Sequence, residues 1–230
     1  MQKNQRLRLR CERLGSELEG VCLNEGMPVF VPGVLPEEEA DVLCVKVQPR
    51  YAFGRLMEVL VPSPDRVEPP CPVYDRCGGC SGQHMRYEAT LAAKRTQVYD
   101  CLTRIGGLPL HLEDVPPVLG AQDPWHCRNK TALPVGGTAD APVLGFYRRR
   151  SHQIVPIDDC PVAMGGLMGV IAAVKEWMRA ERVQPYDEKT GRGLLRHVVT
   201  RVSRAGSLMV VLTATRAKLP GVPRLVERLS

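Results

Sequence analysis

Three cysteines lie close together in the stretch CPVYDRCGGCSGQH: Cys71, Cys77 and Cys80. Thiolates at such short spacing are ligands for zinc or for an iron–sulfur cluster, and a fourth ligand must then come from elsewhere in the chain. We favour Cys160 as this fourth ligand, because a proline follows it, as a proline follows the remote fourth cysteine of bacterial ferredoxins. These residue types predict a metal centre rather than acid–base or nucleophilic chemistry.

The spacing alone leaves zinc and iron–sulfur open. Zinc sites with four cysteines commonly use a two-residue gap in both ligand pairs, and here only Cys77 and Cys80 have one. Disulfides are disfavoured because nine cysteines are an odd number and because no secretion signal is recognisable. No βαβ pattern indicates a thioredoxin-like redox pair. We expect inert buried thiols at the remaining cysteines, which are Cys11, Cys22, Cys44, Cys101 and Cys127.

Positive charge is in excess and is unevenly distributed. The chain has 31 Lys and Arg against 25 Asp and Glu, a net charge of +6 at pH 7. Basic residues gather near the N-terminus, at 148–150 and between 189 and 226, where no acidic residue occurs. Such clusters are typical of proteins that bind a polyanion. No apolar run is long enough to cross a membrane, so we expect no membrane partner. Because the N-terminus lacks the apolar core of a secretion signal, we expect a cytoplasmic protein.

Short strand patterns at the N-terminus predict a small antiparallel barrel. Residues 6–11, RLRLRC, alternate apolar side chains with Arg6, Arg8 and Arg10, and further strand-like runs follow up to Val61. Four prolines within 62–70 then predict a linker.

The rest of the chain mixes helical and strand patterns. Periodicity predicts a helix over 86–105, with an apolar stripe, and a second helix over 164–182 with a buried apolar side. Strands are expected at 131–135, 143–147, 152–157, 194–202 and 207–214, the last two as a hairpin. The fold class expected from these patterns is α+β and rich in β-structure.

Four stretches carry a resemblance to a known family. SPDRVEPPCPVYDRCGGCSGQH, WHCRNKTALPV, GFYRRRSHQIVPIDDCPV and GLLRHVVTRV occur in this order. They resemble the bacterial RNA 5-methyluridine (uracil-5-) methyltransferases of the RumA, RlmD and TrmA type. The resemblance implies that Cys71, Cys77, Cys80 and Cys160 hold a [4Fe–4S] cluster, and it therefore favours iron–sulfur over zinc.

The resemblance also implies a domain order. It places an OB-like antiparallel β-barrel of the TRAM type at 1–62, an iron–sulfur cysteine loop with its following helix at 63–110, and a central α+β RNA-recognition domain at 111–230. In this family a C-terminal Rossmann-like domain binds S-adenosyl-L-methionine and supplies the nucleophilic cysteine. We find neither a glycine-rich strand-to-helix turn nor that cysteine motif, so we expect this domain to be absent and name no catalytic residue.

The implied function is the RNA-recognition and cluster-binding portion of an S-adenosyl-L-methionine-dependent RNA (uracil-C5)-methyltransferase, truncated before its catalytic domain. Ribosomal RNA, specifically 23S rRNA, is the favoured partner, tRNA is the alternative, and a second polypeptide would then supply the methyltransferase domain. Two other readings stay open, a stand-alone RNA-binding module stabilised by zinc or a cluster, and an electron-transfer protein.

RNA contacts are expected from basic side chains rather than from stacking, because aromatic residues make up only 5% of the chain. The candidate RNA-binding residues are Arg6, Arg8, Arg10, Arg128, Lys130, Arg148, Arg149 and Arg150.

Overall fold

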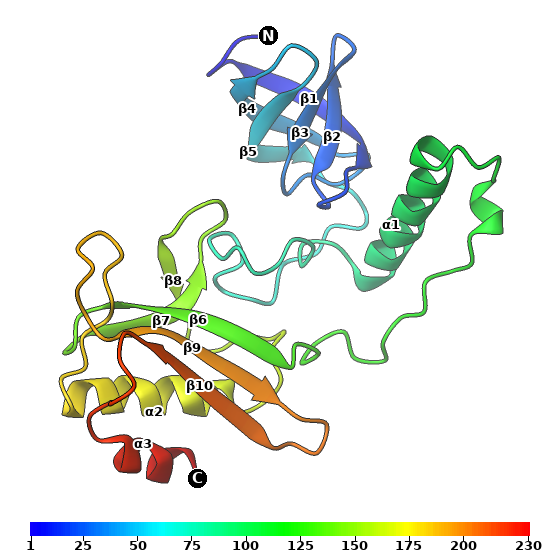
Figure 1. The fold of residues 1–230 in the computed structure, drawn as a ribbon. Helices are drawn as coiled ribbons and strands as arrows, with labels where there is room; N and C mark the ends of the chain where they lie inside the picture. The colour runs from blue at the N-terminus through cyan, green and yellow to red at the C-terminus, as the bar shows by residue number, and fades with distance from the viewer. The chain divides into compact units, whose positions relative to one another are not determined.

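A computed structural model describes residues 1–230, and the chain divides into two compact units (Figure 1). Unit 1 comprises residues 1–69 and 80–121, and unit 2 comprises residues 70–79 and 122–230. The chain therefore passes from unit 1 to unit 2 and back before it completes unit 2. No helix has the length and apolar character that a membrane span requires.

Five strands of unit 1 close into a barrel in the order β1-β2-β3-β5-β4 (Figure 1). The strands are β1 (Arg6–Leu14), β2 (Gly20–Asn24), β3 (Met27–Val31), β4 (Glu39–Val47) and β5 (Ala52–Val61). Alternate residues point inward, and small or β-branched side chains such as Val29, Val42 and Ala52 are fully buried in the core. Alternation in the sequence thus predicts which side chains fill the barrel.

A linker and a helix complete unit 1. Helix α1 (Tyr87–Asp100) continues into a π-helical turn (Cys101–Ile105), which confirms the helix predicted over 86–105. Helix α1 buries none of its residues, and Ile105 is 84% exposed. The linker is instead fixed to the barrel by Arg66, whose guanidinium binds the fully buried Glu38 carboxylate.

Unit 2 is built on an antiparallel sheet with the strand order β10-β9-β6-β7-β8 (Figure 1). The strands are β6 (Lys130–Gly137), β7 (Pro142–Tyr147), β8 (Ile154–Pro156), β9 (Leu195–Val202) and β10 (Leu208–Ala214). Helix α2 (Leu167–Ala180) covers one face of the sheet, and α3 (Val222–Leu229) packs against α2. Leu133, Leu144 and Trp177 lie in the core between them, and the indole N–H of Trp177 donates to Pro220 O at 2.9 Å.

The predicted fold class is wrong on two points. The barrel is not purely antiparallel, because β3 and β5 pair in parallel. Strand β4 lies between β1 and β5, so closure requires β3 to meet β5, which runs in the same direction. An iron–sulfur loop is also not part of the fold, since no group of three or more His, Cys, Asp or Glu side chains is arranged to hold a metal ion.

Candidate nucleic-acid interface

The cysteine-rich segment 70–79 is held by backbone contacts with the β7–β8 hairpin. Gly78 N–H donates to Tyr147 O at 2.9 Å, and Cys77 forms an isolated β-bridge with Arg148. A Cβ atom at Gly78 would lie 2.8 Å from Tyr147 O, so only glycine fits this close approach. Segment 70–79 is therefore packed tightly against the end of a strand at Gly78.

No metal site is found at the predicted cluster ligands Cys71, Cys77, Cys80 and Cys160. The turn between the first two is formed by backbone hydrogen bonds, including one of 2.8 Å from Cys77 N–H to Val73 O. A [4Fe–4S] cluster or a structural zinc ion needs a set of four ligands; no such group is found here, and the role of these cysteines as ligands stays a prediction.

Arg128 links three segments of unit 2. Its Nη2 donates to Gly79 O at 2.9 Å, and its guanidinium carbon lies 5.9 Å from the centre of the Phe146 ring. Its backbone pairs with the segment after Cys160, donating to Val162 O at 2.8 Å and accepting from Met164 N–H at 3.0 Å. A half-buried guanidinium with these contacts holds its neighbours in place, a role that the sequence did not indicate.

Three consecutive arginines form the exposed loop between β7 and β8. Arg148 is anchored by hydrogen bonds between its backbone N–H and Gln153 O at 2.8 Å and between Ser151 N–H and Arg148 O at 3.0 Å. Arg150 has a φ of 56°, which places the tightest part of the turn within the basic run. The hairpin thus presents Arg148, Arg149 and Arg150 side by side at the surface.

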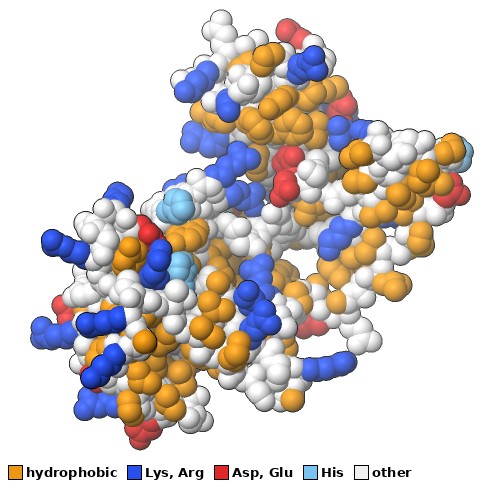
Figure 2. All heavy atoms as spheres, viewed as in Figure 1, with side chains coloured by type: hydrophobic (Ala, Val, Ile, Leu, Met, Phe, Trp, Pro, Cys, Tyr) orange, Lys and Arg blue, Asp and Glu red, His pale blue; other side chains and the backbone are white.

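Lys130 lies directly opposite Arg201 on neighbouring antiparallel strands. Both side chains are exposed, and neither has an acidic partner. Like charges in opposite positions of a sheet repel each other and destabilise it. An anion bound over this pair would offset the repulsion. Figure 2 shows Lys and Arg side chains along one edge of the unit that carries this sheet. Arg201 belongs to the basic region between 189 and 226, but its position opposite Lys130 depends on the strand pairing, which the sequence does not show.

The cysteine-rich segment lies between these two basic elements. Gly78 is bonded to the end of β7, immediately before the arginine loop. Gly79 is bonded to Arg128, two residues before Lys130. Segment 70–79 therefore acts as a spacer that fixes the arginine loop relative to the Lys130 strand, within one unit.

The barrel arginines are exposed but partly neutralised. The Arg6 guanidinium lies 3.5 Å from the Asp41 carboxylate of β4. The Nε of Arg8 donates a hydrogen bond of 2.9 Å to the Glu39 carboxylate of the same strand. Both ion pairs are at the surface, where such pairs contribute about 0–1 kcal/mol and exchange readily for another anion. Arg10 is exposed in the same row, so β1 offers a weaker basic surface than the sequence suggests.

Three aromatic rings meet on the outside of the barrel, a feature that sequence reasoning missed. Phe30, Tyr51 and Phe53 have ring centres 5.5–5.9 Å apart. The alternation YAF at 51–53 indicated a common face for two of them, but their contact with Phe30 depends on the parallel pairing of β3 and β5.

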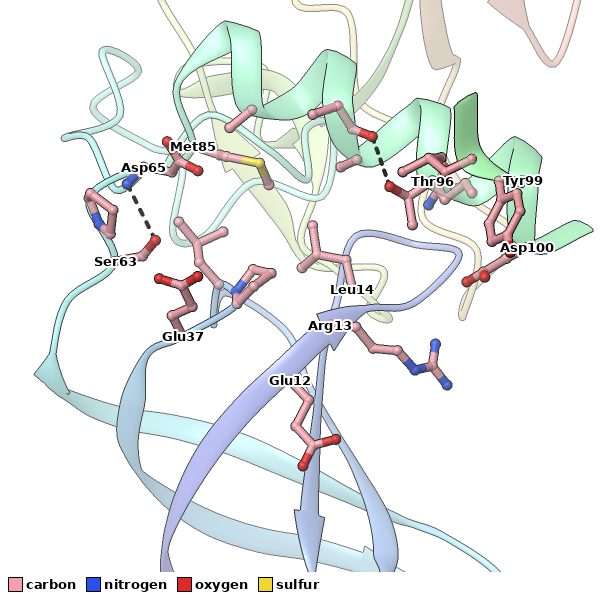
Figure 3. Close-up of a pocket in the computed structure, with 18 of the residues that line it drawn as sticks. Glu12, Arg13, Leu14, Glu37, Ser63, Asp65, Met85, Thr96, Tyr99 and Asp100 are labelled. Carbon is pink, nitrogen blue, oxygen red and sulfur yellow. Dashed lines mark hydrogen bonds between the residues drawn. The ribbon is translucent and has the colours of Figure 1, made fainter. Parts of the chain in front are cut away.

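Unit 1 also contains a pocket of about 540 Å³ between the barrel, the linker and α1. Figure 3 shows Glu12 and Leu14 from β1, and Thr96 and Asp100 from α1, around it. Four carboxylates (Glu12, Glu37, Asp65 and Asp100) and two arginines (Arg13 and Arg104) line it, so its wall carries net negative charge. Such a pocket repels phosphate, and we assign no nucleic-acid contact to it.

Comparisons with known proteins agree with this picture. Residues 2–57 match the model of the TRAM domain. A protein of Listeria innocua named an uncharacterized RNA methyltransferase is 38% identical over 231 residues, covering 100% of this chain and 50% of the relative. A Halalkalibacterium halodurans protein of the same description is 41% identical over 228 residues, covering 99% and 49%. The chain thus spans about half the length of these curated relatives.

A solved structure extends the likeness to both units. The Pyrococcus abyssi tRNA (uracil-54, C5)-methyltransferase, in complex with S-adenosyl-L-homocysteine, superposes with a TM-score of 0.70 and 25% identity. The match covers 95% of this chain and 48% of that enzyme.

The chain thus consists of a TRAM-type barrel followed by a unit built on an antiparallel sheet with basic surface residues. As the sequence motifs predict, the chain is similar over its whole length to RNA methyltransferases, and its first residues form a TRAM domain.

Proposed function

We propose that this chain is the RNA-binding portion of an RNA (uracil-C5)-methyltransferase. The observation that carries the proposal is the basic surface of unit 2, in which segment 70–79 joins the Arg148–Arg150 loop to the Lys130–Arg201 pair. Exposed arginines and lysines are the usual contacts of RNA phosphates. Lys130, Arg148, Arg149 and Arg150 are the phosphate contacts of this proposal, and Arg128 positions them.

The barrel makes a secondary contribution in this proposal. Arg6, Arg8 and Arg10 would exchange their surface carboxylates for phosphates when RNA is bound. Exchange costs little because surface ion pairs are weak.

S-adenosyl-L-methionine is the methyl donor that we propose for the whole enzyme. The support is that the P. abyssi enzyme was solved with S-adenosyl-L-homocysteine, the product left when S-adenosyl-L-methionine donates its methyl group. All paired strands of unit 2 are antiparallel, which does not fit the parallel sheet of nucleotide-binding α/β folds. We therefore assign no contact with the donor to residues of this chain.

A tRNA and a ribosomal RNA segment with an unpaired uridine are the two target classes to compare. A TRAM-type barrel alone does not favour ribosomal RNA, because the P. abyssi match covers 95% of this chain, barrel included, and that enzyme is named for tRNA. Relative affinity for a tRNA and for a 23S rRNA fragment decides between the two targets.

The proposal is tested by measuring RNA affinity of the full chain as a function of salt. If about five phosphates are neutralised on single-stranded RNA, the slope of log K against log salt is about −3.5. The variant Arg148→Gln removes one phosphate contact. It is expected to bind RNA more weakly and to reduce the magnitude of the slope by about 0.7.

Arg228→Gln is the matched control, because it also removes one charge but its side chain is paired with Glu176 on the neighbouring helix. It is expected to leave the slope unchanged. A wild-type slope near zero would overturn the proposal, and equal slopes for both variants would remove Arg148 from the interface.

A further inference from the structure

The three aromatic rings on the barrel lie on its outer surface because of strand alternation. Val29 and Val31 of β3 and Ala52 of β5 are fully buried in the barrel core. The residues between and beyond them, Phe30 and Phe53, therefore point away from that core. Tyr51 directly precedes β5 and is 40% exposed.

The rings hold one another in a fixed arrangement. Tyr51 stands nearly perpendicular to both neighbours, at 76° to Phe30 with ring centres 5.9 Å apart and at 86° to Phe53 with ring centres 5.5 Å apart. Phe30 and Phe53 are tilted by 39° with a 5.9 Å separation. Edge-to-face contacts of this kind are favourable, so the rings form a preorganised surface rather than three independent side chains.

Cations surround this aromatic surface. Lys46 is the cross-strand partner of Phe53, Arg50 precedes Tyr51 in the chain, and Arg55 lies two residues after Phe53 on the same face. All three are exposed, and none has a carboxylate partner. Figure 2 shows apolar side chains on the barrel bordered by Lys and Arg.

Exposed rings beside unpaired cations match the chemistry of an unpaired nucleotide. Each base has a π-face that stacks on an aromatic side chain, and its phosphate is attracted to nearby lysine or arginine. A hydrophobic protein partner would not need this positive border. A double helix would not fit either, because its bases are already stacked and their faces are not accessible.

We propose that Phe30, Tyr51 and Phe53 form a stacking platform for unpaired bases of RNA, with Lys46, Arg50 and Arg55 binding the adjoining phosphates. This inference rests on the proposed RNA-binding function and adds to it a preference for single-stranded segments, read by the barrel. Tyr51 is the most informative of the three, because it is the most exposed ring and its removal disturbs the fold least.

The test measures binding of the full chain to an oligouridine of about ten nucleotides and to the same oligonucleotide with abasic sites at its centre. Wild-type protein is expected to bind the abasic form more weakly. Tyr51→Leu lowers affinity for the intact oligonucleotide by about fivefold to a hundredfold and no longer distinguishes the abasic form. Because the charge is unchanged, the salt slope of this variant stays at the wild-type value.

Tyr51→Phe keeps the ring and is expected to bind like wild-type, which separates stacking from loss of the hydroxyl. Thermal melting of each variant confirms that the barrel is folded. If the wild type binds RNA with a steep salt slope and Tyr51→Leu binds equally well, the platform is refuted while the RNA-binding function stands. If the wild type does not bind RNA at all, both proposals fail.

Discussion

The guanidinium of Arg128 donates a hydrogen bond to the backbone carbonyl of Gly79 at 2.9 Å, across 49 positions of sequence. Together with the contact between Gly78 and Tyr147, this bond fixes segment 70–79 against the strand that leads into the arginine loop. The geometry of the candidate RNA interface therefore depends on a residue that the sequence suggested only as one more phosphate contact.

Removal of this guanidinium is the first prediction. Arg128→Ala breaks a charged hydrogen bond and the contact with Phe146, so the free energy of unfolding should fall by about 1.5–3 kcal/mol. Urea denaturation of the full chain measures the change, and hydrogen exchange at the Gly78 amide should become faster.

Lys130→Ala is the control for this prediction, because Lys130 is exposed and lies two residues away. It should weaken RNA binding with little change in stability. If Arg128→Ala kept wild-type stability and lost only RNA affinity, Arg128 would be a direct phosphate contact and not a positioning residue.

The buried ion pair of unit 1 gives a second prediction. The Glu38 carboxylate is fully buried and accepts hydrogen bonds from Arg66 and from the backbone N–H groups of Leu35 and Ser63. Glu38→Gln leaves the guanidinium without its counter-charge, so the free energy of unfolding should fall by about 3–5 kcal/mol at pH 7.

The exposed ion pair between Arg8 and Glu39 is the control. Glu39→Gln should lower the free energy of unfolding by less than about 1 kcal/mol. Equal losses for Glu38→Gln and Glu39→Gln in urea denaturation would contradict the assignment of Glu38 as the residue that fixes the linker to the barrel.

Acid should weaken the same ion pair. Burial raises the pKa of the Glu38 carboxyl, but the hydrogen bonds from Arg66, Leu35 and Ser63 outweigh burial and bring the pKa below its ordinary value. The pair therefore contributes fully above the unfolded pKa of about 4.3, and its contribution is lost as the pH falls through the lower pKa of the folded state. The stability difference between wild type and Glu38→Gln should shrink on acidification below about pH 4, and a constant difference would exclude this linkage.

Thiol reactivity provides a further prediction. Cys11, Cys22 and Cys44 are buried in the barrel, and the pKa of Cys22 is raised by its hydrogen bond to Cys11 and by burial. Cys101 and Cys127 are exposed, contrary to the expectation that they are inert buried thiols. Alkylation of the folded chain at pH 8, followed by mass spectrometry, should label Cys101 and Cys127 first.

Rapid labelling of the three barrel thiols before those two exposed ones would show that the barrel opens readily. Labelling in urea, where all cysteines should react, is the control for reagent access.

Local patterns predicted much of the fold. The alternation RLRLRC predicted strand β1, apolar periodicity predicted α2, and the strand patterns at 194–202 and 207–214 predicted the β9–β10 hairpin. These features depend on neighbours within a few residues. Strand β2 was missed because GVCLN is short, and α3 was missed because Pro223 in its first turn reads as a break.

Features set by contacts distant in sequence were not predictable. Three close thiols suggested a metal site, yet the path of segment 70–79 is set by Tyr147 and Arg128, which come about 50 to 70 positions later. The aromatic surface on the barrel likewise depends on the parallel pairing that closes the barrel. A scarcity of aromatic residues argued against stacking, but the effect of a few rings depends on whether the fold gathers them.

Ultraviolet cross-linking of the full chain to single-stranded RNA, with mapping of the linked peptides, tests the central claim most directly. The account predicts cross-links in the Arg148–Arg150 loop and around Tyr51. Cross-links confined to the acidic pocket beside α1, or to helices α2 and α3, would contradict it.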